Sequence, residues 1–351
     1  MSTSSEVTRD GVRGIRPDRE ARIGENAGPP PSRSKRSMGD AVVPRPQFQS
    51  YYGLPVLNKP TWEPLDIAGY LFLGGLAGSS SALGAAASLT GRPALARPLQ
   101  YGAAGAISLS LVALVHDLGR PSRFYNMLRV FKPSSPMSVG SWILSAYGPC
   151  ALGAAALPAL GSVLPAPLGP LVRPAIAALS RPLTVGAGVL GPAVATYTGV
   201  LVSDTAVPAW HGGYREMPFL FAGSAASAGA GLGLVAAPLA QAGPARRLGV
   251  AGAVAEVAMG RVMRRRMGLP AEAYESGKAG RLLRVAEALS VGGAALAVAG
   301  RRSRAVSAVG GTCLLAGSAL TRFGIFHAGV ASAEDPRYTV QPQRERADRS
   351  S

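Results

Sequence analysis

Residues Asp66 to Leu89 read DIAGYLFLGGLAGSSSALGAAASL, an apolar run that carries no charge after its first position. A helix of about 20 such residues crosses the hydrocarbon layer of a membrane. Seven further runs of spanning or near-spanning length follow, although 248–262 is short and more polar than the others. They cover 98–115, 141–160, 183–203, 218–242, 248–262, 282–299 and 305–326. We therefore predict an all-α integral membrane protein with eight transmembrane helices.

These runs are rich in Gly, Ala and Ser instead of being uniformly Leu or Phe. Gly74 and Gly78 form one GxxxG step, and Gly229 and Gly233 form another. Small residues let helix backbones approach closely inside a lipid bilayer. The sequence thus predicts a compact bundle with extensive contact between helices.

Charged residues make up 16% of the chain, below the roughly 25% of soluble domains, and the formal net charge is +17. The positive residues fall in the tails and between the apolar runs, without interleaved aromatic residues or a nucleic-acid-binding motif. We interpret them as membrane-flanking charge and expect no nucleic-acid partner.

The composition divides the chain into three parts. Residues 1–50 are basic and rich in Pro, Ser and Gly, which predicts a disordered arm. Residues 51–330 contain all eight apolar runs and form the predicted membrane domain. Residues 331–351 form a polar C-terminal tail.

The residue types limit which redox groups this chain holds by itself. The two cysteines, Cys150 and Cys313, stand alone inside apolar runs, so we expect no iron–sulfur cluster and no structural zinc. The interiors of the predicted helices contain no histidine to serve as an axial ligand, so we expect no haem and no other metal site.

Eight crossings put both termini and three of the connections on one side of the membrane, here called side A. All three histidines, His116, His211 and His327, fall on side A, where His327 is expected to end the last helix. The side A connections contain eleven Lys or Arg, against nine on side B. The excess of positive residues on the inner side of membrane proteins favours a cytoplasmic side A in a bacterial plasma membrane.

The stretch HDLGRPSRFYNMLRVFKPSSPMSVGSW, from His116 to Trp142, concentrates polar residues between two apolar runs. Its apolar side chains recur at helical spacing, and its arginines fall between them. This pattern predicts an interfacial amphipathic segment, or simply an interface helix whose arginines reach the headgroups. The apolar set is Phe124, Met127, Leu128 and Phe131; the arginines are Arg120, Arg123 and Arg129.

Two carboxylates are predicted to lie inside helices, where ionisable groups are costly and usually functional. Glu256 lies about two turns from the side A end of its helix. Glu287 lies at similar depth, one turn after Arg284; the alternative to a functional role is a local ion pair between these two residues, with Arg284 reaching toward the headgroups.

Several side A residues suit the chemistry of a quinone, whose head group needs hydrogen-bond partners and a proton acceptor near water. Tyr197 offers a hydroxyl in an apolar wall, and His116, Asp117, Asp204 and His211 offer titratable groups. Two alternatives remain open. His116 and Asp117 also fit a helix end with an arginine-paired aspartate, and His211 also fits a loop hydrogen bond.

Four stretches resemble the NrfD/PsrC family of polysulfide-reductase-type integral membrane subunits. They are YLFLGGLAGSSS, the stretch from His116 to Trp142, YTGVLVSDTAVPAWHGGYREMPFLFAGSAASAGAG, and TRFGIFHAG. The resemblance covers roughly residues 47–330. It implies eight helices in two four-helix bundles without haem. It also implies electron exchange between membrane quinone and a four-cluster iron–sulfur subunit, which connects to a molybdopterin catalytic subunit.

The resemblance also implies site residues. Tyr197 is the match to a helix tyrosine that holds the quinone head group. Asn58 matches an asparagine before the first helix, but no histidine accompanies it here. We expect His116 and Trp62, with Glu63 or Asp66 as further candidates, to replace that partner.

Our hypothesis is a quinone-reactive membrane anchor of a multisubunit oxidoreductase, using menaquinone or ubiquinone. The alternatives are an ion or small-molecule transporter and a purely structural anchor. In our hypothesis the candidate site residues form three groups. Tyr197, His116, Asn58 and Trp62 bind quinone; Asp117, Asp204, His211, Glu256 and Glu287 transfer protons; Arg120, Arg123, Arg129 and Arg215 dock the partner.

Overall fold

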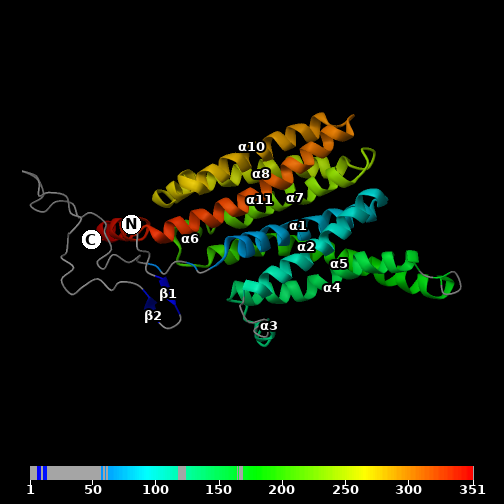
Figure 1. The fold of residues 1–351 in the computed structure, drawn as a ribbon, viewed down its shortest axis with the longest axis horizontal. Helices are drawn as coiled ribbons and strands as arrows, with labels where there is room; N and C mark the ends of the chain where they lie inside the picture. The colour runs from blue at the N-terminus through cyan, green and yellow to red at the C-terminus, as the bar shows by residue number, and fades with distance from the viewer. Residues whose placement is uncertain are drawn as a thin grey trace, which may run out of the picture. The chain divides into compact units, whose positions relative to one another are not determined.

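The computed structural model describes residues 6–8, 11–13, 57, 60, 62–117, 124–163, 165 and 169–350. Each of the eight predicted apolar runs overlaps one long helix (Figure 1). The long helices are α1 (Pro64–Leu89), α2 (Pro93–Asp117), α4 (Pro136–Val163), α5 (Gly169–Ser203), α7 (Met217–Ala236), α8 (Gly243–Met267), α10 (Gly277–Ala299) and α11 (Arg304–Glu334). Short helices α3 (Phe124–Met127), α6 (Pro208–Gly212), η2 (Leu269–Ala271) and α9 (Glu272–Glu275) lie between them.

Seven of the described helices are long and apolar enough to cross a membrane, which confirms a helical protein with several membrane-crossing segments. The long helix outside this set is α8. It carries Glu256 and several arginines, among them Arg261 and Arg264, so its polarity and not its length separates it from the other seven.

Several helix ends differ from the predicted ones. Helix α5 begins at Gly169, well before the predicted start at 183. The fifth run was expected to continue to residue 242, but α7 ends at Ala236, because Ala237 takes the extended conformation that a following proline favours. The eighth run was expected to end at Phe326, but α11 continues to Glu334. His327 therefore lies inside a helix and does not end it.

The chain forms two compact units, and residues 60–332 make up the larger one. The other unit combines residues 1–59 with 333–351. In this second unit, β1 (Glu6–Thr8) pairs antiparallel with β2 (Gly11–Arg13), with Val7 opposite Val12. Most of the predicted disordered arm lies outside the described residues. The predicted polar tail is helical over α12 (Arg337–Ser350).

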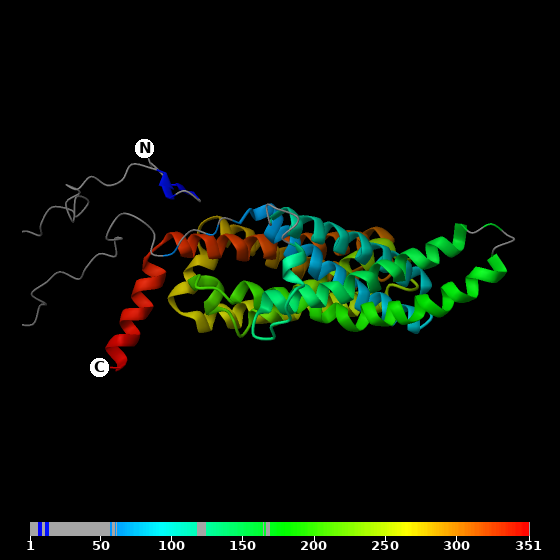
Figure 2. The same cartoon turned by 90° about the horizontal axis from the view of Figure 1, so that it is seen from below.

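Within residues 60–332, four helices form a closed set. Helix α1 packs against α2 and α5, and α4 packs against the same two helices. Helix α7 packs against α1 and α5 on one side and against α8, and α8 packs against α10. Figure 2 shows these long helices running side by side.

A very close backbone approach joins α1 to α5. A Cβ added to Gly78 would lie 2.2 Å from the carbonyl oxygen of Gly191, and one added to Gly191 would lie 2.3 Å from that of Gly78. Likewise, a Cβ on Gly229 of α7 would lie 2.4 Å from Ser79 Oγ. The predicted close packing through small residues is therefore present, although Gly74 makes only ordinary contacts.

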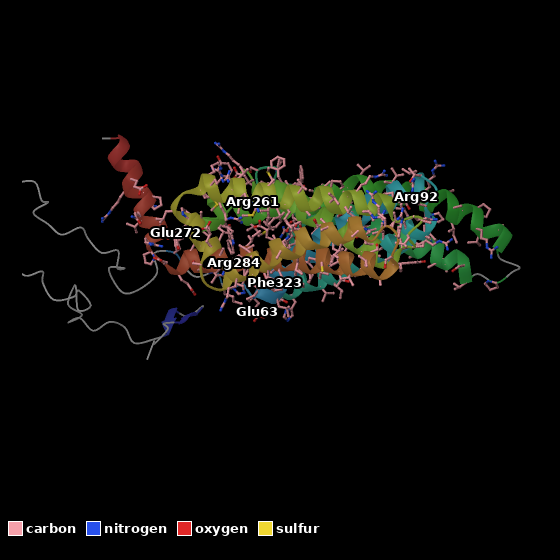
Figure 3. All side chains as sticks on the ribbon, turned by 90° about the horizontal axis from the view of Figure 1, so that it is seen from above. Glu63, Arg92, Arg261, Glu272, Arg284 and Phe323 are labelled. Atoms are coloured by element: carbon pink, nitrogen blue, oxygen red, sulfur yellow. The ribbon has the colours of Figure 1, made fainter. Side chains whose placement is uncertain are left out.

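Successive long helices run in opposite directions, so their ends gather at two levels. We call the level of the α2 C-terminus and α1 N-terminus the His116 end, and the level of the α1–α2 turn the Arg92 end. Figure 3 shows Glu63 and Glu272 toward the first and Arg92 at the second. The three polar connections, including α6 and α9, lie at the His116 end (Figure 1).

Candidate functional site

A histidine–carboxylate pair joins the first two helices at their rim. His116, next to the last residue of α2, places Nδ1 2.7 Å from Oδ2 of Asp66, in the first turn of α1. The His116 side chain is 74% exposed and that of Asp66 is 17% exposed. The imidazole therefore meets water while its partner fixes its orientation, as a group that exchanges protons requires.

Tyr197 lies deeper in the same four-helix set. It stands six residues before the end of α5, which places its backbone about 9 Å from that end. Its ring packs against α4, where a Cβ added to Gly140 would lie 2.3 Å from Cε2. The residue is 8% exposed, and among the described residues its hydroxyl has no hydrogen-bond partner. A buried hydroxyl without a partner costs free energy, so this one is available to a ligand.

Trp62 packs against a second tryptophan. Its ring stacks on Trp210 of α6, with centroids 5.6 Å apart. Trp210 is fully buried and donates from Nε1 to the carbonyl oxygen of Ile325 in α11 at 2.8 Å. Tyr274 of α9 donates to the carbonyl oxygen of Ala209 at 2.9 Å, and burial raises its pKa. Trp62 therefore packs on an aromatic anchor that ties α6, α9 and α11 together.

The remaining rim candidates lie at helix ends or in α6; Asp204 and His211 are exposed, and Asp117 is half-buried. Asp204 follows the last residue of α5, and Asp117 is the last residue of α2. His211 of α6 places Nδ1 3.3 Å from the carbonyl oxygen of Ser203 and stacks on Tyr214. The loop hydrogen bond considered for His211 is therefore present, and it positions the ring close to the end of α5.

An ion pair that the sequence analysis did not identify fixes the connection before α7. Glu216 is buried and accepts from Arg266 Nε at 2.5 Å and from Nη2 at 2.7 Å. This bidentate geometry holds the pKa of the Glu216 carboxyl below its usual value. Arg266 also donates to the carbonyl oxygen of Gly212 at 2.8 Å, so it joins α8 to both ends of the loop.

Glu256 lies at the centre of a buried polar cluster formed by α8, α10 and α11. The residue is 5% exposed. Its carboxylate accepts from Thr321 Oγ1 at 2.6 Å and from Ser290 Oγ at 3.1 Å. The hydroxyls stabilise a carboxylate that the apolar surroundings would otherwise penalise.

Arg322 of α11, next to Thr321, is the most deeply buried charge in the described chain, with 0% exposure. Its guanidinium lies over the ring of Phe221, 3.9 Å from the centroid, and Nη2 donates to that residue's carbonyl oxygen at 3.0 Å. Nε and Nη1 have no hydrogen-bond partner among the described residues. The charge of Glu256 acts favourably on Arg322, so the two form a separated buried pair.

The local pair considered as an alternative for Arg284 and Glu287 is not among the ion pairs of the described residues. Glu287 instead accepts from Arg261 of α8 at 2.5 Å, and Arg264 lies 3.5 Å away. Arg284 donates to the carbonyl oxygen of Glu275 at 3.2 Å. The packing of α8 against α10 brings these arginines to Glu287, and helical spacing within α10 gives no sign of them.

Among its described residues, which begin at Phe124, the predicted amphipathic segment is helical over one turn, Phe124–Met127. Residues 128–135 form turns and irregular chain, and the exposed Phe131 packs edge-on against Trp142 with centroids 6.2 Å apart. The predicted arginine face therefore does not continue along a helix. Arg129 is exposed, and Arg215 donates to the Tyr214 hydroxyl at 2.8 Å. Asn58, Arg120 and Arg123 lie outside the described residues.

The fold and these side chains define a class: a multi-pass helical membrane protein in which His116, His211 and Glu216 lie near one end of the helices. Residues 57–275, more than half of the chain, match the family model described as polysulphide reductase, NrfD. The chain belongs to this family. A comparison with curated proteins finds no match.

Membership defines the protein's general role. NrfD-family proteins are quinone-interacting membrane subunits of oxidoreductase complexes, in which they partner iron–sulfur and molybdopterin subunits.

Proposed function

We propose that this chain passes electrons between membrane quinone and the clusters of a partner iron–sulfur subunit. The observation that carries the proposal is the Tyr197 hydroxyl, buried between α5 and α4 and without a partner among the described residues. A quinone oxygen accepts a hydrogen bond from such a hydroxyl, and the apolar wall accommodates the ring.

Bound quinol supplies two electrons and two protons, and quinone takes up the same numbers in the reverse direction. His116 exchanges protons between the head group and water, because its ring is exposed and Asp66 stabilises its protonated form. Asp117, Asp204 and His211 line the same rim and pass protons to bulk water. Asn58 and Trp62 complete the proposed head-group set.

The electrons leave or enter through the partner's clusters. The exposed Arg129 and Arg215, together with Arg120 and Arg123, form the proposed docking surface at the His116 end, where they face an acidic partner surface. The molybdopterin subunit lies beyond that partner and determines the terminal substrate.

The proposed arrangement in the membrane has eight crossings in two four-helix bundles. One bundle is the closed set of α1, α2, α4 and α5, and the other contains α7, α8, α10 and α11. Residues 51–330 form this membrane domain, between a disordered arm (1–50) and the C-terminal tail. We place the chain in the bacterial plasma membrane with both termini in the cytoplasm, as the arginine and lysine distribution favours.

Within the second bundle, Glu256 is the proposed inner proton site, because a buried carboxylate with hydroxyl partners holds or releases a proton. Glu287 is the outer site on the same route. Glu287 faces Arg261 and Arg264, which join this site to α8.

Purification of the tagged chain from its native membranes tests the proposal. We expect a co-purifying subunit with iron–sulfur absorbance, and reduction of its clusters by added quinol. If quinol does not reduce these clusters, the chain is a structural anchor that does not react with quinone. A chain that purifies alone and moves ions or solutes across vesicles would instead be a transporter.

Variants of the complex test the site itself. Tyr197→Phe and His116→Ala are expected to slow quinol-dependent cluster reduction while the subunits remain assembled. Unchanged quinol kinetics in both variants would remove these residues from the site.

A further inference from the structure

The connections at the Arg92 end are exclusively positive. Residues 90–98, 161–182, 236–250 and 299–310 contain nine arginines and no Lys, Asp or Glu. The His116 end differs, because its connections mix arginine and lysine with acids such as Glu216, Glu272 and Glu275. Charges of one sign without acidic neighbours in these connections give the Arg92 end a positive field that attracts anions.

Part of this charge concentrates where α8 meets the α10–α11 turn. Arg246, in the first turn of α8, donates from Nε to the carbonyl oxygen of Ala297 in α10 at 2.8 Å. This bond brings the guanidinium to the α10–α11 turn, where Arg301 follows Ala297 by four residues. Its Nη2 is buried and has no hydrogen-bond partner among the described residues.

Arg304 shows how the fold neutralises one of these charges. Its Nη1 donates to the carbonyl oxygen of Leu234 at 2.5 Å, and its Nη2 donates to that of Val235. Both carbonyls belong to the last turn of α7, the negative end of the helix dipole. Arg247, Arg301 and Arg302 are exposed; Arg247 lies near the start of α8, and Arg301 and Arg302 lie in the turn that follows α10.

Exposed apolar side chains flank the same cluster. Val298, one turn before Arg301 and Arg302, is 42% exposed, and Val309, on the first turns of α11, is 54% exposed. Helices α10 and α11 are membrane-crossing, so their shared turn lies at the level of the lipid headgroups. Arginines at headgroup level beside exposed valines match a molecule with a phosphate and acyl chains.

We propose that the Arg92 end binds an anionic phospholipid at the α8/α10–α11 junction. Arg246 and Arg301 hold its phosphate, Arg247 and Arg302 flank the headgroup, and the acyl chains lie on Val298 and Val309. The bound lipid replaces the missing acidic residues and removes the repulsion between the two central arginines. This site lies at the opposite end from the quinone site and does not depend on it.

Thermal melting of the full chain in nanodiscs tests the proposal. Wild-type protein is compared in phosphatidylcholine alone and in phosphatidylcholine with added phosphatidylglycerol or cardiolipin. We expect Tm to rise with the anionic fraction. The Arg246→Gln/Arg301→Gln variant should lose at least half of that rise. In phosphatidylcholine alone, Arg301→Gln should melt at or above the wild-type Tm, because a repulsive charge has been removed.

The matched control is Arg265→Gln/Arg281→Gln, which removes the same charge from exposed arginines at the His116 end and should keep the full rise. A rise that survives in the junction variant, or that the control loses equally, would overturn the proposal. If the double variant does not fold, the single variant Arg301→Gln, at an exposed position, is tested for the same loss of the lipid-dependent rise in Tm.

Two further results separate lipid from other anions. If inorganic phosphate raises the Tm of detergent-solubilised protein as much as the lipid does, the site binds soluble phosphate and the lipid assignment fails. If an acidic protein partner binds this end, and the junction variant abolishes that binding without any lipid dependence, the proposal fails as well. Native mass spectrometry should show a retained anionic phospholipid on wild type that the junction variant lacks.

Discussion

Removing the Tyr197 hydroxyl is expected to affect stability and quinone chemistry in opposite directions. The hydroxyl is buried and has no partner among the described residues. Leaving such a group unsatisfied costs about 1–3 kcal/mol, so Tyr197→Phe should keep the stability of the quinone-free protein or raise it by about 1 kcal/mol. If the hydroxyl bonds a quinone oxygen, its loss costs about 0.5–1.5 kcal/mol of binding. That corresponds to a roughly twofold to tenfold higher KM for quinol.

Tyr147→Phe is the matched control. The Tyr147 side chain is also fully buried in the same four-helix set, but its hydroxyl is 2.8 Å from Ser81 Oγ. Phenylalanine there breaks a buried hydrogen bond and leaves the serine unsatisfied, which costs about 1–3 kcal/mol. The control should therefore melt at a lower temperature while its KM for quinol stays unchanged.

The assay is a melting curve of each quinone-free variant, followed by quinol titration of the assembled complex. The Tyr197 and Tyr147 variants should differ from each other both in melting temperature and in KM for quinol. Our reasoning about Tyr197 is refuted if Tyr197→Phe loses as much stability as Tyr147→Phe. It is also refuted if the KM for quinol of Tyr197→Phe equals that of the wild type.

Three further predictions concern packing and charge. Gly78→Leu should destabilise the fold by about 3 kcal/mol or more and prevent normal melting in detergent, because even a Cβ there overlaps a backbone carbonyl. Acidification should weaken the connection before α7. Because the pKa of Glu216 is lowered in the folded protein, its ion pair with Arg266 stabilises the fold fully at pH values above the carboxyl's pKa in the unfolded chain. This stabilisation is lost as the pH falls through the pKa of Glu216 in the folded protein. Glu256→Gln and Arg322→Gln should each cost about 3 kcal/mol, and the double variant should cost less than their sum.

Each of these predictions has its own control. Gly105→Ala, where a Cβ meets nothing within 4 Å, should leave melting unchanged or improved. Glu216→Gln should flatten the acid-side dependence of Tm, and an unaltered slope would contradict the ion-pair account. Strict additivity of the Glu256 and Arg322 changes would show that the two buried charges do not interact.

Hydropathy located the helices because the bilayer demands apolar runs, but it could not place every end. Helix α11 continues past Phe326 through Ala and Ser residues that favour a helix without being strongly apolar, up to the residues before Pro336. Conversely, the apolar spacing of Phe124 to Phe131 gave only one turn, because Pro133 and Pro136 follow too closely for a longer helix.

In the candidate site, the residue types could be chosen from the sequence, but most of their contact partners could not. His116 and Tyr197 could be nominated from their residue types and positions, and Asp66 was a reasonable partner because the two helix ends meet. The partners of Glu287 and Glu216 could not be found this way, since both are arginines of α8 that only tertiary packing brings near. The sequence RRRM at 264–267 shows that α8 ends in positive charge, but it does not indicate which carboxylates these arginines contact.

The contact between Gly78 and Gly191 also constrains biogenesis. Helix α1 can pair with α2 as soon as that hairpin leaves the ribosome, but its closest backbone partner belongs to α5, which is synthesised much later. The first hairpin must therefore wait in the bilayer with its glycine surface uncovered. A delay at this stage, or a chaperone that shields that surface, would control how much of the subunit reaches its mature form.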